Sequence, residues 1–300
     1  MKQDHPKSGI GLLCGLFGRT RHAYYDAMWR KEGCLVLEDV ILQEVAALRR
    51  DLPRLGVRKL HHLLAPALLP HGIRIGRDYL FDLLSEHGML VRRRKRRVFT
   101  TDSRHWMRKY SNLARGVAVT GPEQLWVSDI TYIGTGVKWG YLSLVTDAHS
   151  RKIMGYCFRD DLSAEGCIAA LRMALGNRVH GGTLMHHSDR GSQYCSHQYV
   201  ELLVRNKVSI SMTENGDPYE NALAERVNGI IKTEFNLYNT GLGFEQTHDK
   251  VRKSIGAYNE LRPHASCDYL TPNQAHMESV ELAKRWKNYK RRKEDVGTAV

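Results

Sequence analysis

The stretch from His186 to Lys232 constrains the fold of this 300-residue chain more than any other. It opens with a short apolar run, T-L-M-H-H, that ends just before Asp189, and closes on a helix-like sequence that carries Glu225; 35 residues lie between the two acids. Between them the pattern predicts a helix at about 196–205 and then a strand, K-V-S-I-S-M. This alternation is typical of a mixed sheet with helices on its faces.

Three strand-like runs precede this stretch. Two of them, 125–133 and 139–146, are rich in β-branched and aromatic residues, and a third, 152–158, follows after a link short enough for a hairpin. A helix is expected at 161–177, where the residues are mostly apolar. We therefore predict an α/β unit with a mixed sheet over residues 119–280.

Two acids stand at unusual positions in this predicted unit. Asp129 interrupts a strand that otherwise looks buried, where an ionised carboxylate is costly unless it is paired or binds metal. Asp189 directly follows a strand, at the edge where α/β folds place ligands. Taken singly, a salt bridge would explain the first acid and an ordinary turn would explain the second.

The helix that carries Glu225 is expected to begin at Asp217, because Asp217, Pro218 and Glu220 fit the N-cap, first and third positions of a helix. Steps of four, three and four residues then define one polar stripe, which consists of Asn221, Glu225, Asn228 and Lys232. A solvated helix face is the usual explanation of such a stripe, but a solvated face would carry more charges and fewer amides.

Three carboxylates without thiolates suit a hard cation, Mg²⁺ or Mn²⁺. Two such ions, about 3.5–4 Å apart, support in-line phosphoryl displacement. This chemistry needs no covalent nucleophile, and the sequence offers no convincing one. His186 and His187 are close enough to Asp189 to touch a metal or a phosphate, although packing is the better interpretation for at least one of them.

The charge of the chain is unevenly distributed. The formal net charge is +13, yet residues 1–115 carry a net +12, residues 116–280 carry a net −3, and the basic tail 281–300 carries the remainder. Such asymmetry favours a nucleic-acid-binding front on a catalytic middle. Six consecutive cations, which repel one another, predict an extended linker that contacts a phosphate backbone; they are Arg92, Arg93, Arg94, Lys95, Arg96 and Arg97.

The front of the chain is expected to be helical. Residues 1–34 suggest two short helices around Gly18, as in a helix-turn-helix, and residues 35–91 suggest a small helical DNA-binding domain that begins with an amphipathic helix at Leu35. A packing or dimerisation module explains these helices equally well when charge is ignored. The basic connection to the catalytic unit is placed at 92–118.

The six cysteines are scattered and include no C-x-x-C pair, which argues against a zinc ribbon and against a disulfide framework. The sequence shows no secretory signal and no apolar run long enough to span a membrane. We expect a cytoplasmic, nucleoid-associated protein.

Several motifs occur together in the chain: W-V-S-D-I-T-Y, H-S-D-R-G-S-Q-Y, the 35-residue gap, N-A-x-A-E-R, and the later Y-N-E-L-R-P-H and L-T-P. With these motifs the chain resembles the second-frame (OrfB-type) transposases of bacterial insertion sequences, which have a retroviral-integrase-like core. The resemblance covers nearly the whole chain. One departure is Arg226, which stands where a serine often follows the glutamate.

The resemblance implies an RNase-H-like fold with Asp129, Asp189 and Glu225 as a DDE triad. It implies two Mg²⁺ or Mn²⁺ ions, cleavage that exposes a 3′-hydroxyl, and attack by that hydroxyl on a second phosphodiester. Lys232 matches a position that contacts terminal DNA in such enzymes. A homo-oligomer on the DNA ends is expected, and an upstream-frame partner protein is a further possibility. A nuclease without joining activity and a non-enzymatic DNA-binding regulator remain alternatives.

Overall fold

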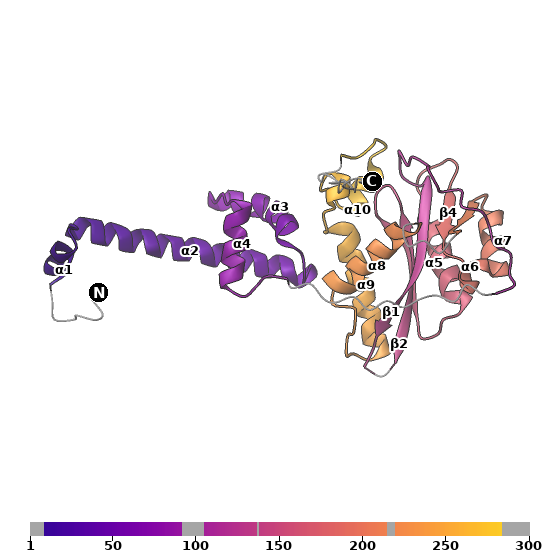
Figure 1. Cartoon of the computed structure of the whole chain (residues 1–300), viewed down its shortest axis with the longest axis horizontal. Helices are drawn as coiled ribbons and strands as arrows, with labels where there is room; N and C mark the ends of the chain where they lie inside the picture. Colours follow the sequence, from indigo (N-terminus) through magenta and orange to yellow (C-terminus); the bar gives the residue numbers. More distant parts are fainter. Residues whose placement is uncertain (1–8, 92–104, 137, 215–219, 284–300) are drawn as a thin grey trace, which may run out of the picture. The chain divides into compact units, whose positions relative to one another are not determined.

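The computed structural model describes residues 9–91, 105–136, 138–214 and 220–283, and it leaves the side chains of residues 30–34 undescribed (Figure 1). The basic run 92–97, most of the tail 281–300, and Asp217 with Pro218 therefore lie outside the described residues. The chain forms two compact units. Unit 1 comprises residues up to 50 together with 56–90, and unit 2 comprises 51–55 together with the chain from residue 91 onward.

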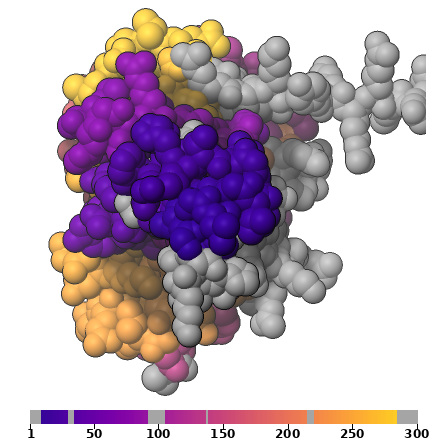
Figure 2. All heavy atoms as spheres, turned by 90° about the vertical axis from the view of Figure 1, so that its left-hand side faces the viewer, coloured from indigo at the N-terminus to yellow at the C-terminus, as the bar shows by residue number. Residues whose placement is uncertain are grey.

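Unit 1 is helical. Its elements are α1 (Ile10–Leu16), α2 (Arg21–Asp51), α3 (Val57–Leu68), the 3₁₀ turn η1 (Leu69–His71) and α4 (Arg77–Glu86). Gly18 takes a left-handed backbone conformation in the turn between α1 and α2, and the Thr20 hydroxyl accepts a hydrogen bond from the Ala23 N–H at 3.1 Å. A helix lies on each side of Gly18, as expected, but only the first is short. Figure 2 shows their surface in indigo.

The helix expected to begin at Leu35 begins instead at Arg21, so the predicted boundary after residue 34 falls inside one 31-residue helix. The reason is that Gly33 is the only strong helix-weakening residue in this stretch. It costs about 1 kcal/mol relative to alanine, which is too little to end a helix without a proline or a cap. The core of the unit consists of fully buried aliphatic side chains, among them Ile41, Val45, Leu60, Leu64, Leu80 and Leu84.

Unit 2 is built on a five-stranded sheet with the order β3-β2-β1-β4-β5. The strands are β1 (Leu125–Gly134), β2 (Trp139–Asp147), β3 (Ile153–Arg159), β4 (Met185–Ser188) and β5 (Ser209–Met212). The first three pair antiparallel, whereas β4 pairs parallel with β1 and β5 parallel with β4. Each strand overlaps the strand predicted for it, so the mixed α/β sheet is confirmed.

Helices cover both faces of this sheet (Figure 1). They are α5 (Ala164–Gly176), α6 (Ser192–Cys195), α7 (His197–Arg205), α8 (Ala222–Glu234), α9 (Phe244–Glu260), the 3₁₀ turn η2 (Ala265–Cys267) and α10 (Pro272–Met277). Because strand side chains alternate between faces, Trp126 of β1 packs in the cluster formed with α5, α6 and α7. Its neighbour Val127 packs with Ala224 of α8. Asp129 has the parity of Val127 and therefore belongs to the α8 face.

The helix of Glu225 begins at Ala222, directly after Glu220 and Asn221 in a turn. The start expected at Asp217 lies outside the described residues. The predicted capping role of Glu220 fails because its carboxylate is engaged elsewhere: it accepts the Glu214 N–H at 2.6 Å and the Arg115 guanidinium at 3.2 Å. The N-cap residue is Asn221, and its side chain makes no cap hydrogen bond.

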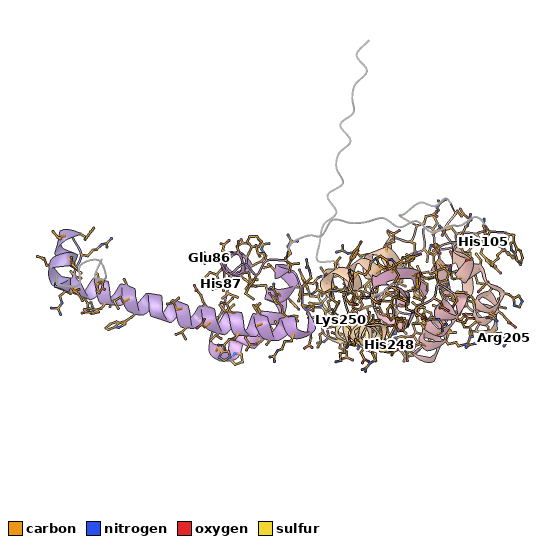
Figure 3. The ribbon with its side chains drawn as sticks, turned by 90° about the horizontal axis from the view of Figure 1, so that it is seen from below. Glu86, His87, His105, Arg205, His248 and Lys250 are labelled. Atoms are coloured by element: carbon orange, nitrogen blue, oxygen red, sulfur yellow. The ribbon has the colours of Figure 1, made fainter. Side chains whose placement is uncertain are left out.

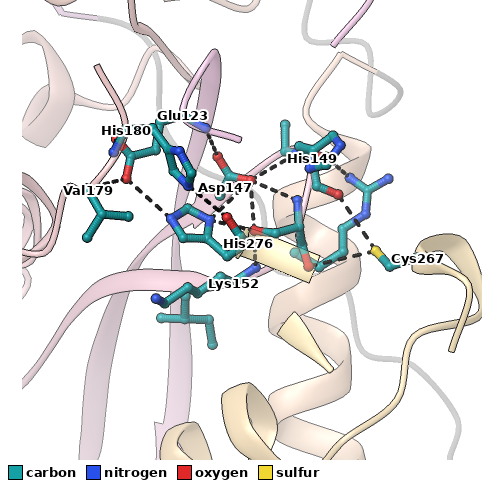
Figure 4. A network of polar contacts seen from close by, with 12 residues as sticks. Glu123, Asp147, His149, Lys152, Val179, His180, Cys267 and His276 are labelled. Carbon is teal, nitrogen blue, oxygen red and sulfur yellow. Dashed lines mark hydrogen bonds and ion pairs between the residues drawn. The ribbon is translucent and has the colours of Figure 1, made fainter. Parts of the chain in front are cut away.

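A buried polar network holds the C-terminal part of unit 2 against the sheet (Figure 4). Asp147, at the end of β2, accepts the Glu123 N–H at 2.7 Å and the Ser150 hydroxyl at 2.8 Å. The His276 ring of α10 bridges Glu123 Oε1 at 3.2 Å and Ser150 Oγ at 3.0 Å. The Val179 N–H also donates to Glu123, at 2.8 Å. These contacts fix α10 at the end of the sheet where strand β1 begins and strand β2 ends.

No helix in the described part of the chain is long and apolar enough to span a membrane.

Candidate active site

Asp129 lies half-buried on β1. Its Oδ1 accepts the N–H of Ile130 at 2.9 Å, and its Oδ2 accepts the side-chain amide of Asn228 at 2.8 Å. Burial and, next, the charge of Asp189 raise the pKa of Asp129 to about 7, against the opposing effect of the two hydrogen bonds; Glu225 adds a smaller increase. In the metal-free protein the pKa of this carboxyl thus lies near neutrality.

Asp189 follows β4 directly, as the sequence predicted. Strands β1 and β4 pair in parallel with Trp126 beside His186 and Val127 beside His187. Asp129 and Asp189 come two residues after this last pair, one on each chain segment. They line one small cleft together with Tyr132 and Gln193 among others. Asp189 Oδ1 accepts the Gly191 N–H at 3.0 Å, which orients the carboxylate. The sheet register therefore brings the first two acids together.

Glu225 stands in the first turn of α8 and is exposed. It is close enough to add to the pKa rise of Asp129, but it contributes the smallest of the increases. Among the described residues, no group of three His, Cys, Asp or Glu side chains is close enough to hold a metal ion. Asp129 and Asp189 are therefore adjacent, whereas Glu225 lies on the neighbouring helix beyond joint coordination reach in this conformation.

Two asparagines of the predicted polar stripe are buried and connect α8 to β1. Asn228 donates to Asp129, and Asn221 donates to the Ser128 carbonyl at 3.0 Å. Both amide Oδ1 atoms are buried and accept no hydrogen bond within the described structure. The spacing of these residues in the sequence placed them in one polar stripe, but it did not predict that their side chains hydrogen-bond to β1.

Lys232 is half-buried at the other end of α8. Burial lowers the pKa of its ammonium group, and the negative charge of Asp129 partly opposes that effect. Its Nζ lies 5.5 Å from the centre of the Tyr238 ring. The lysine thus lies within electrostatic range of the first carboxylate.

Both histidines before Asp189 are packing residues. His186 Nε2 lies 2.8 Å from the Ser128 hydroxyl and 2.9 Å from the Tyr199 hydroxyl, and burial lowers the pKa of its ring to about 3. His187 Nδ1 lies 2.8 Å from the Ser211 hydroxyl, which ties β4 to β5. A metal-binding role is not needed to explain either ring.

Models of the integrase core domain family match residues 119–218 and 206–272. The 31 kDa protein of insertion element IS600 from Shigella sonnei is 31% identical over 265 residues, covering 87% of this chain and 96% of that protein. The transposase for insertion sequence element IS629 from Shigella sonnei is 30% identical over 233 residues, covering 75% and 77%. This chain belongs to the insertion-sequence transposases with an integrase core.

The transposase family is thus the one that the sequence motifs indicated, and the mixed sheet with helices on both faces is its RNase-H-like core. Among solved structures, the catalytic core domain of HTLV-2 integrase in complex with magnesium aligns with 52% of this chain and 97% of its own, at 20% identity and a TM-score of 0.42. The family models begin at residue 119. The roles assigned to residues 1–118 therefore stay predictions.

Proposed function

We propose that this transposase cuts DNA at the ends of an insertion sequence and joins the exposed 3′-hydroxyls to target DNA, with Asp129, Asp189 and Glu225 as its catalytic carboxylates. The observation that carries the proposal is the adjacency of Asp129 and Asp189. The two carboxylates are half-buried, and their repulsion helps to raise the pKa of Asp129 to about 7. Such a pair forms a site that favours a cation. No charged side chain hydrogen-bonds to Asp129 in the described structure to neutralise it; its polar partners are an amide and a backbone N–H.

The donors at this site fit Mg²⁺ or Mn²⁺. Asp129 and Asp189 offer carboxylate oxygens, and the buried, unpartnered Oδ1 of Asn228 is a further hard oxygen acceptor beside them. We assign Asp129 and Asp189 as metal ligands and Glu225 as the third. When bound, two such ions would activate the attacking oxygen and stabilise the leaving oxygen of a phosphodiester.

The residues of the chain orient the carboxylates for this role. The Asn228 amide and the Gly191 N–H each hold one oxygen of an aspartate, which fixes the direction in which that carboxylate faces. Glu225 is exposed and can change rotamer without breaking a packed core. Lys232, on which the charge of Asp129 already acts, is suited to hold a phosphate of the terminal DNA.

The same proposal includes the rest of the chain. Residues 1–115 carry most of the net positive charge, which supports recognition of the DNA ends by this part and by the basic run 92–97. Because two ends of an element must be joined to one target, we propose that the protein acts as a homo-oligomer.

Three substitutions test the catalytic assignment. Asp129→Asn, Asp189→Asn and Glu225→Gln should each abolish strand cleavage in Mg²⁺ and leave DNA binding within about twofold, because each removes a charge and little volume. The matched control is Glu245→Gln, which alters another exposed acid in the first turn of a helix of the same unit. Cleavage that persists in Asp189→Asn would contradict the assignment. Supplying a pre-cut end and measuring joined products separates a transposase from a nuclease.

A further inference from the structure

Residues 105–110, His-Trp-Met-Arg-Lys-Tyr, carry an exposed tryptophan that the catalytic site does not use. The Trp106 side chain is 93% exposed, and no large apolar side chain in the described structure is more exposed. Burying such a ring would contribute substantially to stability. Its exposure therefore leaves a large apolar face available to a ligand.

The backbone around Trp106 is held firmly against unit 2. His105 Nε2 lies 2.7 Å from the Arg190 carbonyl oxygen, and Met107 and Tyr110 pack against the core cluster of α5, α6 and α7. Just beyond, the Ser111 carbonyl accepts the Met212 N–H of β5 at 3.3 Å. Trp106 is therefore presented outward from an anchored backbone.

This segment passes close to Asp189, one of the proposed catalytic carboxylates. The His105 contact is made to Arg190, the residue that follows Asp189. Burial raises the pKa of the Cys195 thiol, and the charge of Asp189 adds to that rise. The cations of Lys109 and Arg190 oppose it. Lys109, Arg190 and Asp189 are therefore all close enough to Cys195 to act on its thiol. Figure 3 shows His105 at the end of unit 2 away from His248 and Lys250 of α9.

Two cations follow Trp106 closely in the sequence. Arg108 and Lys109 are both exposed, and the Arg108 guanidinium lies 5.1 Å from the centre of the Tyr110 ring. An exposed aromatic ring within three residues of two exposed cations is a combination suited to unpaired nucleotides, because every base has a face to stack and every nucleotide has a phosphate. A purely apolar protein partner would leave both cations without counter-charges.

We propose that residues 105–110 form a platform on which Trp106 stacks an unpaired base of the DNA end, while Arg108 and Lys109 hold adjacent phosphates. The proposal rests on the proposed function, which makes a DNA end the substrate of the neighbouring carboxylates. A stacked base would keep the strand that enters the cleft separated from its complement. Stacking is tolerant of base identity, so the platform would select an open end rather than a sequence.

The test uses the full chain without divalent metal and a DNA duplex with a short single-stranded tail that contains 2-aminopurine, whose fluorescence falls on stacking. The wild-type protein should quench the tail. Trp106→Ala should abolish the quenching and weaken binding of the tailed duplex by about fivefold to about a hundredfold, with little effect on a blunt duplex. Trp106→Phe should retain most of both effects, because it keeps an aromatic face.

Trp139→Ala is the matched control, since Trp139 is also an exposed tryptophan of unit 2 and lies at the start of β2. It should leave quenching and affinity unchanged. Replacing Arg108 and Lys109 by Gln should keep the quenching and reduce the salt slope of binding by about 1 for each phosphate that the variant no longer neutralises.

Equal weakening of tailed and blunt duplexes by Trp106→Ala would overturn base stacking and indicate that the ring touches duplex DNA. Unchanged DNA binding with altered self-association would overturn it in favour of a protein partner. Asp189→Asn separates the two proposals. If that variant quenches the tail and still cleaves when Mg²⁺ is added, the platform stands and the catalytic assignment fails. If it quenches the tail but no longer cleaves, while Trp106→Ala loses the quenching, both proposals are supported.

Discussion

In the Asn228 side chain the amide nitrogen is hydrogen-bonded, whereas the amide oxygen has no partner among the described residues. The Nδ2 atom donates to Asp129, while the buried Oδ1 has no hydrogen-bond partner in the described structure. An amide beside a carboxylate that binds metal commonly orients that ligand, and loss of such a partner costs about 10- to 100-fold in metal affinity or activity.

Asn228→Ala should therefore raise the Mg²⁺ concentration needed for half-maximal cleavage by about 10- to 100-fold. A metal titration of cleavage measures it. Asn206→Ala, which removes an exposed amide at the end of α7, should leave the titration unchanged. An identical metal requirement in Asn228→Ala would mean that the hydrogen bond only serves packing.

The pKa of Asp129 predicts how the metal-free protein responds to pH. A carboxyl whose pKa is about 7 in the folded state and ~4 in the unfolded chain is protonated more readily when folded. Its contribution to folding stability is therefore most favourable at low pH and is lost as pH rises from about 4 to about 7.

With EDTA present, Asp129→Asn should raise Tm at pH values above this window and make Tm less dependent on pH within it. Thermal melts across the window provide the measurement. The control is Asp160→Asn, which alters an exposed carboxylate paired with Lys138 at 2.6 Å. A lower Tm for Asp129→Asn at every pH would show that the charge of Asp129 does not destabilise the fold.

At the residue scale, the sequence identified the acids and the stripe that contains Asn228, because both follow from spacing. It did not identify the partner of Asp129, since the asparagine lies 99 residues further along the chain. It also left His186 and His187 open between a ligand role and a packing role. The choice depends on Ser128 and Tyr199 for His186 and on Ser211 for His187, which only the folded chain brings near.

The C-terminal end of α8 is fixed by a buried ion pair. Arg262 is 1% exposed and donates through Nε and Nη2 to the two carboxylate oxygens of Glu234, each at 2.7 Å. This fork holds the helix that carries Glu225 against the segment after α9. The motif R-P-H marked Arg262 in the sequence, and the structure explains the arginine by bidentate geometry.

Arg262→Met should destabilise unit 2 by about 3–5 kcal/mol, because Glu234 loses its buried bidentate partner. Adding Glu234→Gln to this variant should recover part of the loss. Urea unfolding measures both. Arg252→Met breaks the exposed pair with Asp249 and should cost at most about 1 kcal/mol. Equal losses in the two arginine variants would contradict the role given to the buried fork.

Strand β3 and helix α5 approach each other closely at Gly155. A Cβ placed there would lie 2.1 Å from the Ala170 carbonyl oxygen and 2.6 Å from the Ala174 nitrogen. Gly155→Ala should therefore destabilise unit 2 by at least about 1–3 kcal/mol. Gly229→Ala, inside α8 with no atom near its Cβ, should stabilise it by about 0.5–1 kcal/mol. Chemical denaturation of the two variants should give changes of opposite sign.

At the element scale, the sequence predicted the five strands because their apolar residues are dense and bounded by turns. Helix α9 was not predicted, since its buried face includes Thr247 and Ser254, which interrupt the apolar period. The start of α8 was predicted too early because Glu220 is engaged by Arg115 and Glu214, partners that are distant in sequence or lie outside the helix. Local signals determined the elements, and tertiary contacts determined where several of them begin.

At the scale of the whole molecule, the chain divides into parts whose net charges differ in sign. The net +12 of residues 1–115 contrasts with the net −3 of residues 116–280, so the integrase core does not attract DNA through its overall charge. The basic run 92–97 lies outside the described residues.

Replacing Arg92, Arg93 and Arg94 by Gln should weaken DNA binding and reduce the salt slope by about 0.9 for each phosphate that the run no longer neutralises. Fluorescence anisotropy over a range of salt concentrations measures this change. The matched control neutralises three cations of α9, namely Lys250, Arg252 and Lys253, and should have a smaller effect. An equal effect of the two triple variants would contradict a special role for the run.

The repulsion between Asp129 and Asp189 affects what happens to an insertion sequence when copies of its transposase gene acquire mutations. On the proposed assignment, a substitution that removes either charge would end catalysis and would at the same time relieve the charge repulsion in the metal-free fold. Decayed copies of the gene would then encode durable proteins that still occupy the DNA ends. Inactive copies would compete with intact ones, and the element would become quieter as its damaged descendants accumulate in a genome.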